Sequence, residues 1–278
     1  MTIINKLPKV LLQSFLWIYF LISVYPLVWM VFYSLKNNDE IFVTNPFGIP
    51  THFRFENYIH AWNKFNLLRY IGNSLFVSTM TTIGVVIFAV MFAYAIARLQ
   101  WKFREFVRTY MIIGMFIPLQ VIMIPLAIMM KNLYLTNTYG ALIIPYIAIG
   151  LPFASLVFYG FLRGIPFEME ESACMDGASI YRAFFKIILP IITPAIATII
   201  ILQFLGSWNE FLLAYTLISK EALRTLPIGL VYFQGQYATD WGGMGAVMTI
   251  ASLPMVVLFL FFSEQVERAM TVNSAVKG

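Results

Sequence analysis

Six long runs without a charged residue constrain this chain more than any other feature of its sequence. Each run exceeds the roughly 20 residues that an α-helix, rising about 1.5 Å per residue, needs to cross a hydrocarbon core about 30 Å thick. The sequence therefore predicts an all-α membrane protein with six transmembrane helices. The runs are residues 10–35, 70–97, 109–130, 132–162, 187–209 and 241–263.

Composition supports this class, because only 11% of the 278 residues are charged, against roughly 25% in ordinary soluble domains. The first run follows Lys6 and Lys9 as the apolar core of a signal peptide would. It is longer than the 7–15 residues typical of a cleaved peptide, and it closes on the bulky Trp29, Phe32 and Tyr33. We therefore expect an uncleaved first span and one membrane domain, residues 1–278.

Lysine and arginine predict the orientation, since cytoplasmic loops carry an excess of both. The side with both termini holds Lys6, Lys9, Arg98, Lys102, Arg104, Arg108, Arg163, Arg182, Lys186, Arg268 and Lys277. The other side holds Lys36, Arg54, Lys64, Arg69, Lys131, Lys220 and Arg224. We therefore place the termini, the loop 163–190 and the tail 264–278 in the cytoplasm. The loop 36–69 is then external, with a short amphipathic helix near residues 55–62.

A polar block at residues 168–190 separates two apolar runs on the cytoplasmic side. Pro166 suits the first position of a helix, and the glutamates that follow it complement the helix dipole. Gly177 can take the positive φ that closes this helix, and Ser179 can cap a second one that runs to Pro190. The block is either a docking element for a partner or an ordinary elbow between spans.

The spacing within this block resembles the EAA loop of ABC-importer permeases. The matching residues are Glu171-Ser172-Ala173, then Gly177, then Ile188-x-Pro190, with Ser172 in place of the first alanine. Other segments are similar to the carbohydrate branch of that family, the maltose-type second permease in particular. They are Asp176-Gly177-Ala178, Leu189-Pro190, Trp208-Asn209-Glu210-Phe211 and the tail Ala275-Val276-Lys277-Gly278. The resemblance covers nearly the whole chain.

This resemblance implies a type I ABC-importer permease bundle in a bacterial cytoplasmic membrane, importing a sugar, with a di- or oligosaccharide expected. Such a permease pairs with a second permease, here expected to be a different chain, and with two ABC ATPase subunits and an extracytoplasmic solute-binding protein. The implied coupling residues are Glu170, Glu171, Ser172, Ala173, Asp176, Gly177 and Ala178. The tail residues Val276, Lys277 and Gly278 are implied to approach the ATPase.

No G-x-x-x-x-G-K-[ST] segment occurs in the chain, so ATP and Mg are expected on the ATPase subunits. The chain is thus expected to be a transport subunit rather than an enzyme. Its positive charge follows from the cytoplasmic loops and predicts no nucleic-acid partner. His52 and His60 lack the cysteines or carboxylates of a metal site, and the single cysteine, Cys174, excludes an internal disulfide.

A sugar pathway needs aromatic faces and hydrogen-bonding groups. Trp208 and Asn209 offer both near the end of the fifth run, and Asn73 is a polar residue in the second. Glu210 either lines the pathway or ends a helix facing external water. Prolines 118, 125, 145 and 152 kink the middle spans, as in a gated pathway but also as in static bundles.

Three other function classes are weighed against the importer. A secondary sugar or polyol carrier usually leaves ionisable residues inside its spans, and these six runs have none. A membrane enzyme needs convergent His, Asp, Glu or Cys residues at the bilayer face. A purely structural subunit would not require a docking block.

Overall fold

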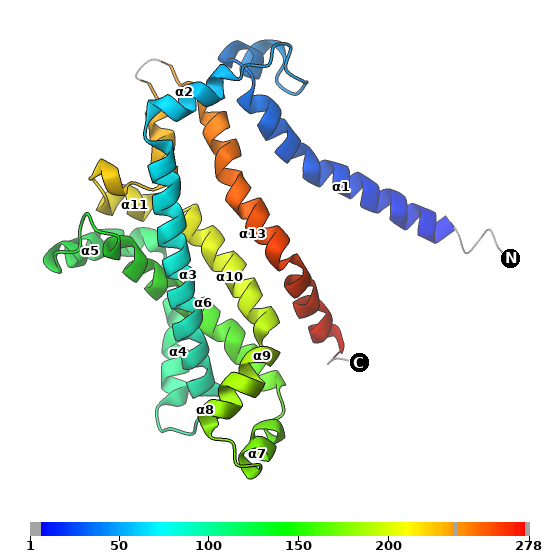
Figure 1. Cartoon of the computed structure of the whole chain (residues 1–278), viewed down its shortest axis with the longest axis vertical. Coiled ribbons are helices and arrows are strands. Elements are labelled where there is room, and N and C mark those ends of the chain that lie inside the picture. The colour runs from blue at the N-terminus through cyan, green and yellow to red at the C-terminus, as the bar shows by residue number, and fades with distance from the viewer. Residues whose placement is uncertain (1–6, 236–237, 276–278) are drawn as a thin grey trace. The chain divides into compact units, whose positions relative to one another are not determined.

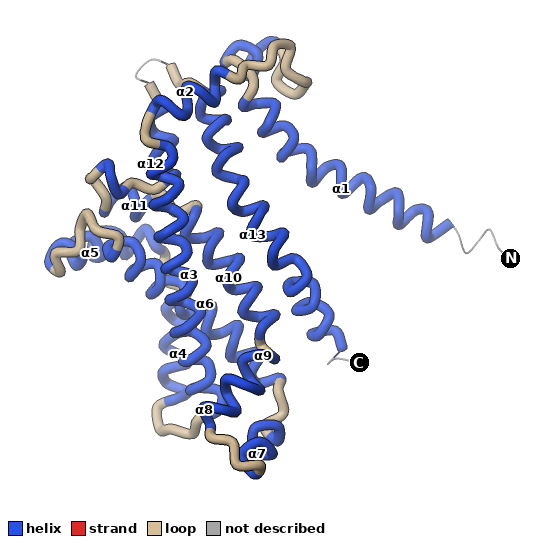
Figure 2. Tube along the Cα trace, in the orientation of Figure 1, coloured by secondary structure: helices blue, strands red, loops and turns tan. Residues whose placement is uncertain are grey.

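The computed structural model describes residues 7–235 and 238–275. Over these residues the chain consists of helices joined by loops and turns, without a strand (Figure 2). The chain divides into two compact units, each built from two separate segments. The first unit contains Met1–Leu67 and Gly229–Leu253, and the second contains Leu68–Ile228 and Pro254–Gly278.

Four continuous helices are long and apolar enough to cross a membrane, and two bent helix pairs pass the same test (Figure 1). The continuous helices are α1 (Leu7–Ser34), α3 (Leu67–Arg98), α6 (Gly140–Gly164) and α13 (Trp241–Ala275). The pairs are α4 (Arg104–Gly114) with α5 (Leu119–Asn132), and Ile180–Ile191 with α10 (Thr193–Trp208). Each coincides with one predicted run, and the all-α membrane class is confirmed.

The third and fifth runs differ from the prediction. The third is broken at a proline where a kink was predicted, and the fifth is broken where one continuous span was predicted. α4 and α5 meet at 104°. Pro118 stands before α5 in an extended conformation (φ −64°, ψ 137°), and a proline disfavours the helical conformation in the residue before it. The fifth run bends by 70° at Ile192, between Pro190 and Pro194. Pro125, Pro145 and Pro152 instead lie inside α5 and α6.

The shorter helices connect these long ones. In the first unit they are η1 (Glu40–Thr44), α2 (Glu56–Lys64) and η4 (Leu230–Phe233). In the second they are α7 (Glu168–Met175), α8 (Ile180–Ala183), η2 (Phe184–Ile188), α9 (Leu189–Ile191), α11 (Leu212–Leu217) and η3 (Glu221–Leu223). The helix α12 (Leu226–Gly229) lies at the junction of the two units. The amphipathic helix predicted near residues 55–62 is α2.

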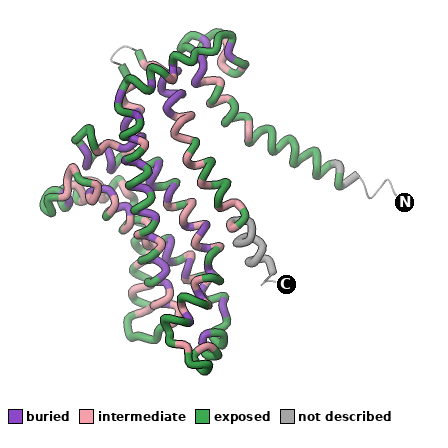
Figure 3. The backbone as a smooth tube through the Cα atoms, in the orientation of Figure 1, coloured by how far each residue is buried: buried purple, intermediate pink, exposed green. Residues whose placement is uncertain are grey.

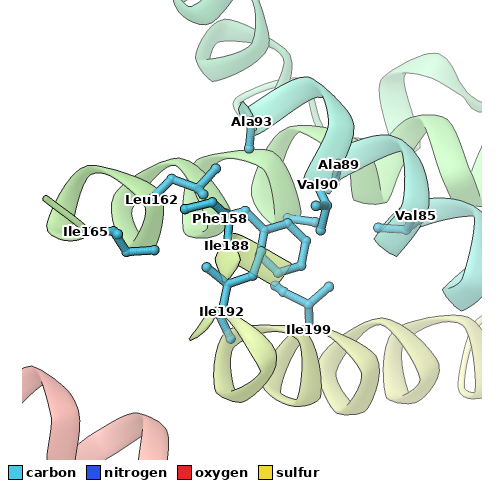
Figure 4. Packing of buried hydrophobic residues seen from close by; sticks show 12 residues of the cluster. Val85, Ala89, Val90, Ala93, Phe158, Leu162, Ile165, Ile188, Ile192 and Ile199 are labelled. Carbon is cyan, nitrogen blue, oxygen red and sulfur yellow. The ribbon is translucent and has the colours of Figure 1, made fainter. Parts of the chain in front are cut away.

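The second unit contains two buried apolar clusters, one formed mainly by α3, α6, η2 and α10 and the other mainly by α5, α6 and α11. Phe158 of α6 lies at the centre of the first cluster, next to Val90, Ile188 and Ile199 (Figure 4). Alanines of α3, α6 and α10 also belong to it and permit close approach of the helices. Because lipid is as apolar as these side chains, such close packing rather than exclusion of water stabilises the association.

The apolar surface of α1 is largely open in this chain. Its most apolar 18-residue window has no buried residue, and Figure 3 shows most of the helix as exposed. Phe15, Trp17 and Ile22 are examples, each more than half exposed. In a membrane, such side chains contact lipid or another protein instead of water.

Two buried charged side chains order the loop that follows α1. Lys36 is almost fully buried, and its Nζ donates to the carbonyl oxygens of Asn45 (2.5 Å) and Gly48 (2.7 Å). Glu40 accepts hydrogen bonds from Thr51 N (2.6 Å) and Asn45 Nδ2 (3.2 Å). Burial raises the pKa of Glu40, but these hydrogen bonds and the charge of Lys36 together lower it below its ordinary value. The loop is therefore a defined structure.

Candidate functional site

The polar block of the second unit folds as the predicted helix, turn and helix. Gly177 has φ +85°, and the N–H of Ala178 donates to the carbonyl of Ala173 (2.9 Å). The N–H of Gly177 donates to the carbonyl of Cys174 (3.0 Å), which completes a Schellman motif at the end of α7. Ser179 Oγ then caps α8 by accepting from Arg182 N (3.3 Å). The predicted roles of Gly177 and Ser179 in the backbone are confirmed.

A buried ion pair fixes α7 to the end of α3. Glu170 Oε1 lies 2.8 Å from Arg98 Nε, and the side chains of both residues are 8% exposed. Tyr94 Oη donates to Glu170 Oε2 (2.8 Å), and Arg98 Nη2 donates to the carbonyl of Ile165 (2.8 Å). The guanidinium of Arg98 also lies over the ring of Phe167, 5.7 Å from its centroid. We call Tyr94, Arg98 and Glu170 the α7 anchor.

The anchor separates Glu170 from the other residues predicted to couple. Glu170 points into the protein, so it is not part of an exposed docking surface, although the sequence grouped it with Glu171. Tyr94 and Arg98 are not predicted from the sequence as site residues, because Arg98 serves there only as one of the basic residues that indicate the orientation. A signal for them does exist in the sequence, since residues four apart share one face of a helix.

The remaining coupling residues are open or partly open to solvent. Glu171, Ser172, Asp176 and Gly177 are exposed, and Ala173 and Ala178 are half-buried. Two large apolar side chains that the sequence prediction missed accompany them: Met175 is 88% exposed and Tyr181 is 78% exposed. We call Glu171, Ser172, Met175, Asp176 and Tyr181 the coupling surface. Exposed apolar side chains among acidic ones are typical of a protein-docking surface.

The candidate pathway residues occupy different environments. Trp208 is 2% exposed and stacks on Phe204, with ring centroids 5.7 Å apart. Asn73 is buried, and its Nδ2 donates to the carbonyls of Ala222 (3.0 Å) and Arg224 (2.9 Å). Asn73 Oδ1 accepts from Tyr139 Oη (2.7 Å). Trp208 and Asn73 therefore make packing contacts within the second unit, and their side chains are not accessible to a solute.

Glu210 follows α10 and caps the next helix. Its carboxylate accepts from Leu213 N (2.8 Å) and Ala214 N (3.1 Å) at the start of α11, and from Tyr146 Oη (2.5 Å). Glu210 thus lies at a helix end, as one sequence interpretation expected, but its carboxylate is half-buried and hydrogen-bonded rather than facing external water. Asn209 is the exposed member of the four candidate residues.

In the described part of the chain, no group of three His, Cys, Asp or Glu residues is placed to hold a metal ion. Cys174 is exposed on α7. The predicted contacts of Val276, Lys277 and Gly278 with an ATPase lie outside the described residues.

The chain has known relatives over most of its length. The profile of the family described as "Binding-protein-dependent transport system inner membrane component" matches residues 85–272. The chain belongs to this family. The permease is therefore a multi-pass membrane component of a transport system rather than an enzyme, and the predicted ABC-importer permease family is confirmed.

Curated relatives agree with this assignment. The permease is 36% identical over 264 residues to the probable ABC transporter permease protein YurM of Bacillus subtilis, covering 95% of this chain and 87% of that one. It is 34% identical over 251 residues to the sulfoquinovosyl glycerol transport system permease protein SmoH of Agrobacterium fabrum (90% and 88% covered). It is 33% identical over 247 residues to the diacetylchitobiose uptake system permease protein NgcG of Streptomyces coelicolor (88% and 82% covered).

A solved structure shows the same fold. It is the crystal structure of a bacterial ABC transporter involved in the import of the acidic polysaccharide alginate. One of its chains matches the permease with a TM-score of 0.78 at 19% identity, over 95% of this chain and 98% of that one. At this identity the likeness establishes the fold.

Proposed function

We propose that the permease forms one half of the translocation pathway of an ATP-driven importer for a di- or oligosaccharide. The coupling surface is the observation that carries this proposal. It is a solvent-exposed helix–turn–helix with acidic and apolar side chains, held to the spanning helix α3 by the buried anchor. The sugar class is supported by relatives whose names refer to sulfoquinovosyl glycerol, diacetylchitobiose and arabinooligosaccharides.

The proposed partners are a second permease chain, two ABC ATPase subunits and an extracytoplasmic solute-binding protein. A second alginate transporter structure, with a TM-score of 0.66, contains a periplasmic protein bound to an alginate pentasaccharide and supports the last of these. ATP and Mg would bind to the ATPase subunits. The excess of lysine and arginine supports cytoplasmic termini and a cytoplasmic coupling surface.

The α7 anchor gives the coupling surface a mechanical role in this proposal. A partner that moves α7 also moves the end of α3, because the buried ion pair and the hydrogen bond from Tyr94 to Glu170 join them. The Schellman turn fixes α8 relative to α7, and η2 and α9 continue from α8 toward α10. Movement at the coupling surface is therefore transmitted to two helices of the first apolar cluster.

The first experiment is purification of the tagged permease in mild detergent after co-expression with its genomic neighbours. We expect a second permease and an ATP-binding subunit to remain bound, and sugar uptake into proteoliposomes to require ATP. A permease that purifies alone, and still moves a sugar without ATP, would instead be a secondary carrier.

A variant of the turn makes this experiment specific to the coupling surface. A Cβ atom at Gly177 meets no heavy atom within 4 Å, so the main effect expected of Gly177→Val is on the backbone, whose φ of +85° disfavours a β-branched residue. Gly164 also has open space around it and has no positive φ, so Gly164→Val is the matched control. We expect normal membrane insertion of both variants and loss of the ATPase from Gly177→Val alone. Normal uptake by Gly177→Val would refute the docking role.

A further inference from the structure

A polar hollow of about 310 Å³ lies where the end of α3, the start of α4 and the end of α6 meet. Arg104 and Arg108 of α4 and Arg163 of α6 line it, together with Glu105 and Tyr159. The hollow lies outside the coupling surface and the candidate pathway. Nothing in the proposed transport function uses these five side chains.

The lining carries an excess of positive charge. Glu105 Oε2 lies 2.7 Å from Arg108 Nη2, and Glu105 Oε1 lies 3.6 Å from Arg104 Nε. Arg163 has no carboxylate partner among the residues that the structure describes. Three guanidinium groups therefore face one carboxylate, and the hollow is suited to an anion.

The aromatic ring of Tyr159 holds two of these cations in position. The guanidinium carbons of Arg108 and Arg163 lie 5.4 Å and 5.9 Å from the ring centroid, and Arg108 Nη1 donates to Tyr159 Oη (3.0 Å). Arg108 Nε is buried and has no hydrogen-bond partner within the described chain. A guanidinium fixed in this way presents a rigid set of donors that matches the oxygens of a phosphate group.

An apolar crevice continues from the polar hollow along the helices. It shares Arg108 and Tyr159 with the hollow, but its volume of about 10 Å³ is too small for an acyl chain. The helix α4, which supplies Arg104 and Arg108 to the hollow, also exposes Phe106, Tyr110 and Ile113. A cationic hollow on a helix with exposed apolar side chains is complementary to an amphiphile, whereas a free phosphate ion would contact only the hollow.

We propose that this hollow binds the phosphate headgroup of an anionic phospholipid, with the acyl chains outside it along the exposed apolar side chains of α4. Basic pockets between spanning helices near the membrane surface are suited to such headgroups. Arg104, Arg108 and Arg163 bind the phosphate oxygens, and Tyr159 orients two of the three guanidinium groups. This site does not depend on the identity of the transported solute, so its test is independent of the proposed function.

The test is a lipid titration of the full-length permease in neutral detergent, read as bound lipid by native mass spectrometry and as the midpoint of thermal unfolding. The probes are dioleoylphosphatidylglycerol, dioleoylphosphatidylcholine, glycerol phosphate and inorganic phosphate. We expect the anionic lipid to bind and to raise the midpoint, with little effect from the other three probes. Equal binding of the two lipids would overturn the proposal. Equal stabilisation by inorganic phosphate would replace it with a site for free anions.

Charge variants locate the site within the basic surface. Arg163→Gln removes a hollow-lining cation whose described contact is the ring of Tyr159, and we expect it to weaken binding of the anionic lipid about fivefold. Lys102→Gln is the matched control, because exposed Lys102 lies on the adjoining loop and does not line the hollow. Less than twofold weakening is expected there, and the unfolding midpoint without lipid should not change in either variant. If both variants weaken binding of the anionic lipid equally, the lipid is attracted by the general positive charge of this surface and not by the hollow.

Discussion

Two glutamates of the second unit, Glu170 and Glu210, stabilise different parts of the fold. Glu170 and Glu210 each accept a hydrogen bond from a tyrosine of a spanning helix, Tyr94 of α3 and Tyr146 of α6 respectively. Glu170 also pairs with the guanidinium of Arg98, whereas Glu210 is paired with the backbone amides of Leu213 and Ala214. The charge of Glu170 is therefore balanced by a positive side chain of another helix, whereas the charge of Glu210 is balanced by backbone N–H groups of the helix that follows it.

The Glu170–Arg98 pair therefore connects two helices that are distant in sequence. The bonds from the amides of α11 to Glu210 instead cap a helix next to it in the chain. Removing Glu170 leaves a buried guanidinium and disconnects α7 from α3. Removing Glu210 leaves uncapped amides only a few residues away in sequence, which can rearrange within α11. The ion pair should therefore be the more costly of the two to break, and it should affect coupling as well as stability.

The largest effect is expected for Arg98→Gln, which leaves the buried carboxylate of Glu170 without its counter-charge. Breaking such a pair by removing one partner costs about 3–5 kcal/mol. We expect a large drop in the thermal midpoint of the detergent-solubilised permease, together with weaker binding of the ATPase. Lys186→Gln, at an exposed site in the same polar block, is the charge-matched control.

A double variant distinguishes the pair from a general effect of Arg98. Arg98→Gln combined with Glu170→Gln leaves no charge in the α7 anchor, so it should recover part of the loss. Additive losses in the double variant would show that Arg98 acts through Ile165 and Phe167 instead of Glu170.

A smaller effect is expected for Glu210→Gln, because an amide offers one acceptor oxygen to three donors. Hydrogen bonds to a charged group contribute about 1.5–3 kcal/mol. The thermal midpoint should fall by less than in Arg98→Gln, and the ATPase should stay bound. Loss of the ATPase at normal expression would contradict the local role assigned to Glu210.

The two tyrosines provide a matched pair that sharpens the comparison. Tyr94→Phe leaves Glu170 with its guanidinium, whereas Tyr146→Phe removes the only side-chain hydrogen bond that the structure describes for Glu210. We expect about 0.5–1.5 kcal/mol for Tyr94→Phe and about 1.5–3 kcal/mol for Tyr146→Phe. Chemical denaturation of both variants in one detergent measures the order, and a reversed order would break the comparison.

The smallest effect on stability is expected for Asn209→Ala. Asn209 is exposed, and substitutions at such sites usually change stability by no more than about 0.5 kcal/mol. Uptake should nevertheless fall if the side chain contacts the sugar. Recovery of the intact complex with reduced transport would support a pathway role, and loss of the complex would indicate a structural one.

The sequence predicted what depends on local chemistry. Charge-free runs located the spanning helices, and Gly177 and Ser179 defined the turn because a positive φ and a helix cap are properties of single residues. The breaks at Pro118 and Ile192 could not be distinguished from kinks, since the angle depends on what packs beside the helix.

Burial of polar residues depends on distant partners and was not predicted. Glu170 and Glu171 are the same residue type at adjacent positions, so the sequence does not distinguish them. Successive helix residues point about 100° apart, and the position of α3 decides which of the two is buried. Asn73 lies in an apolar run as a pathway residue would. Its partners, Ala222 and Arg224, are about 150 positions later in the chain.

The first unit joins the N-terminal segment of the chain to residues 229–253, and this has a consequence for biosynthesis. Asn38 Nδ2 donates to the carbonyl of Thr239 (2.7 Å), and Asn38 Oδ1 accepts from Trp241 N (3.1 Å). About 160 residues of the second unit separate its two segments, and a ribosome adding roughly 5–20 residues per second needs about 8–32 s to make them. Throughout that interval α1 is already synthesised while its loop lacks both partners. Folding of this unit therefore cannot follow the order of synthesis.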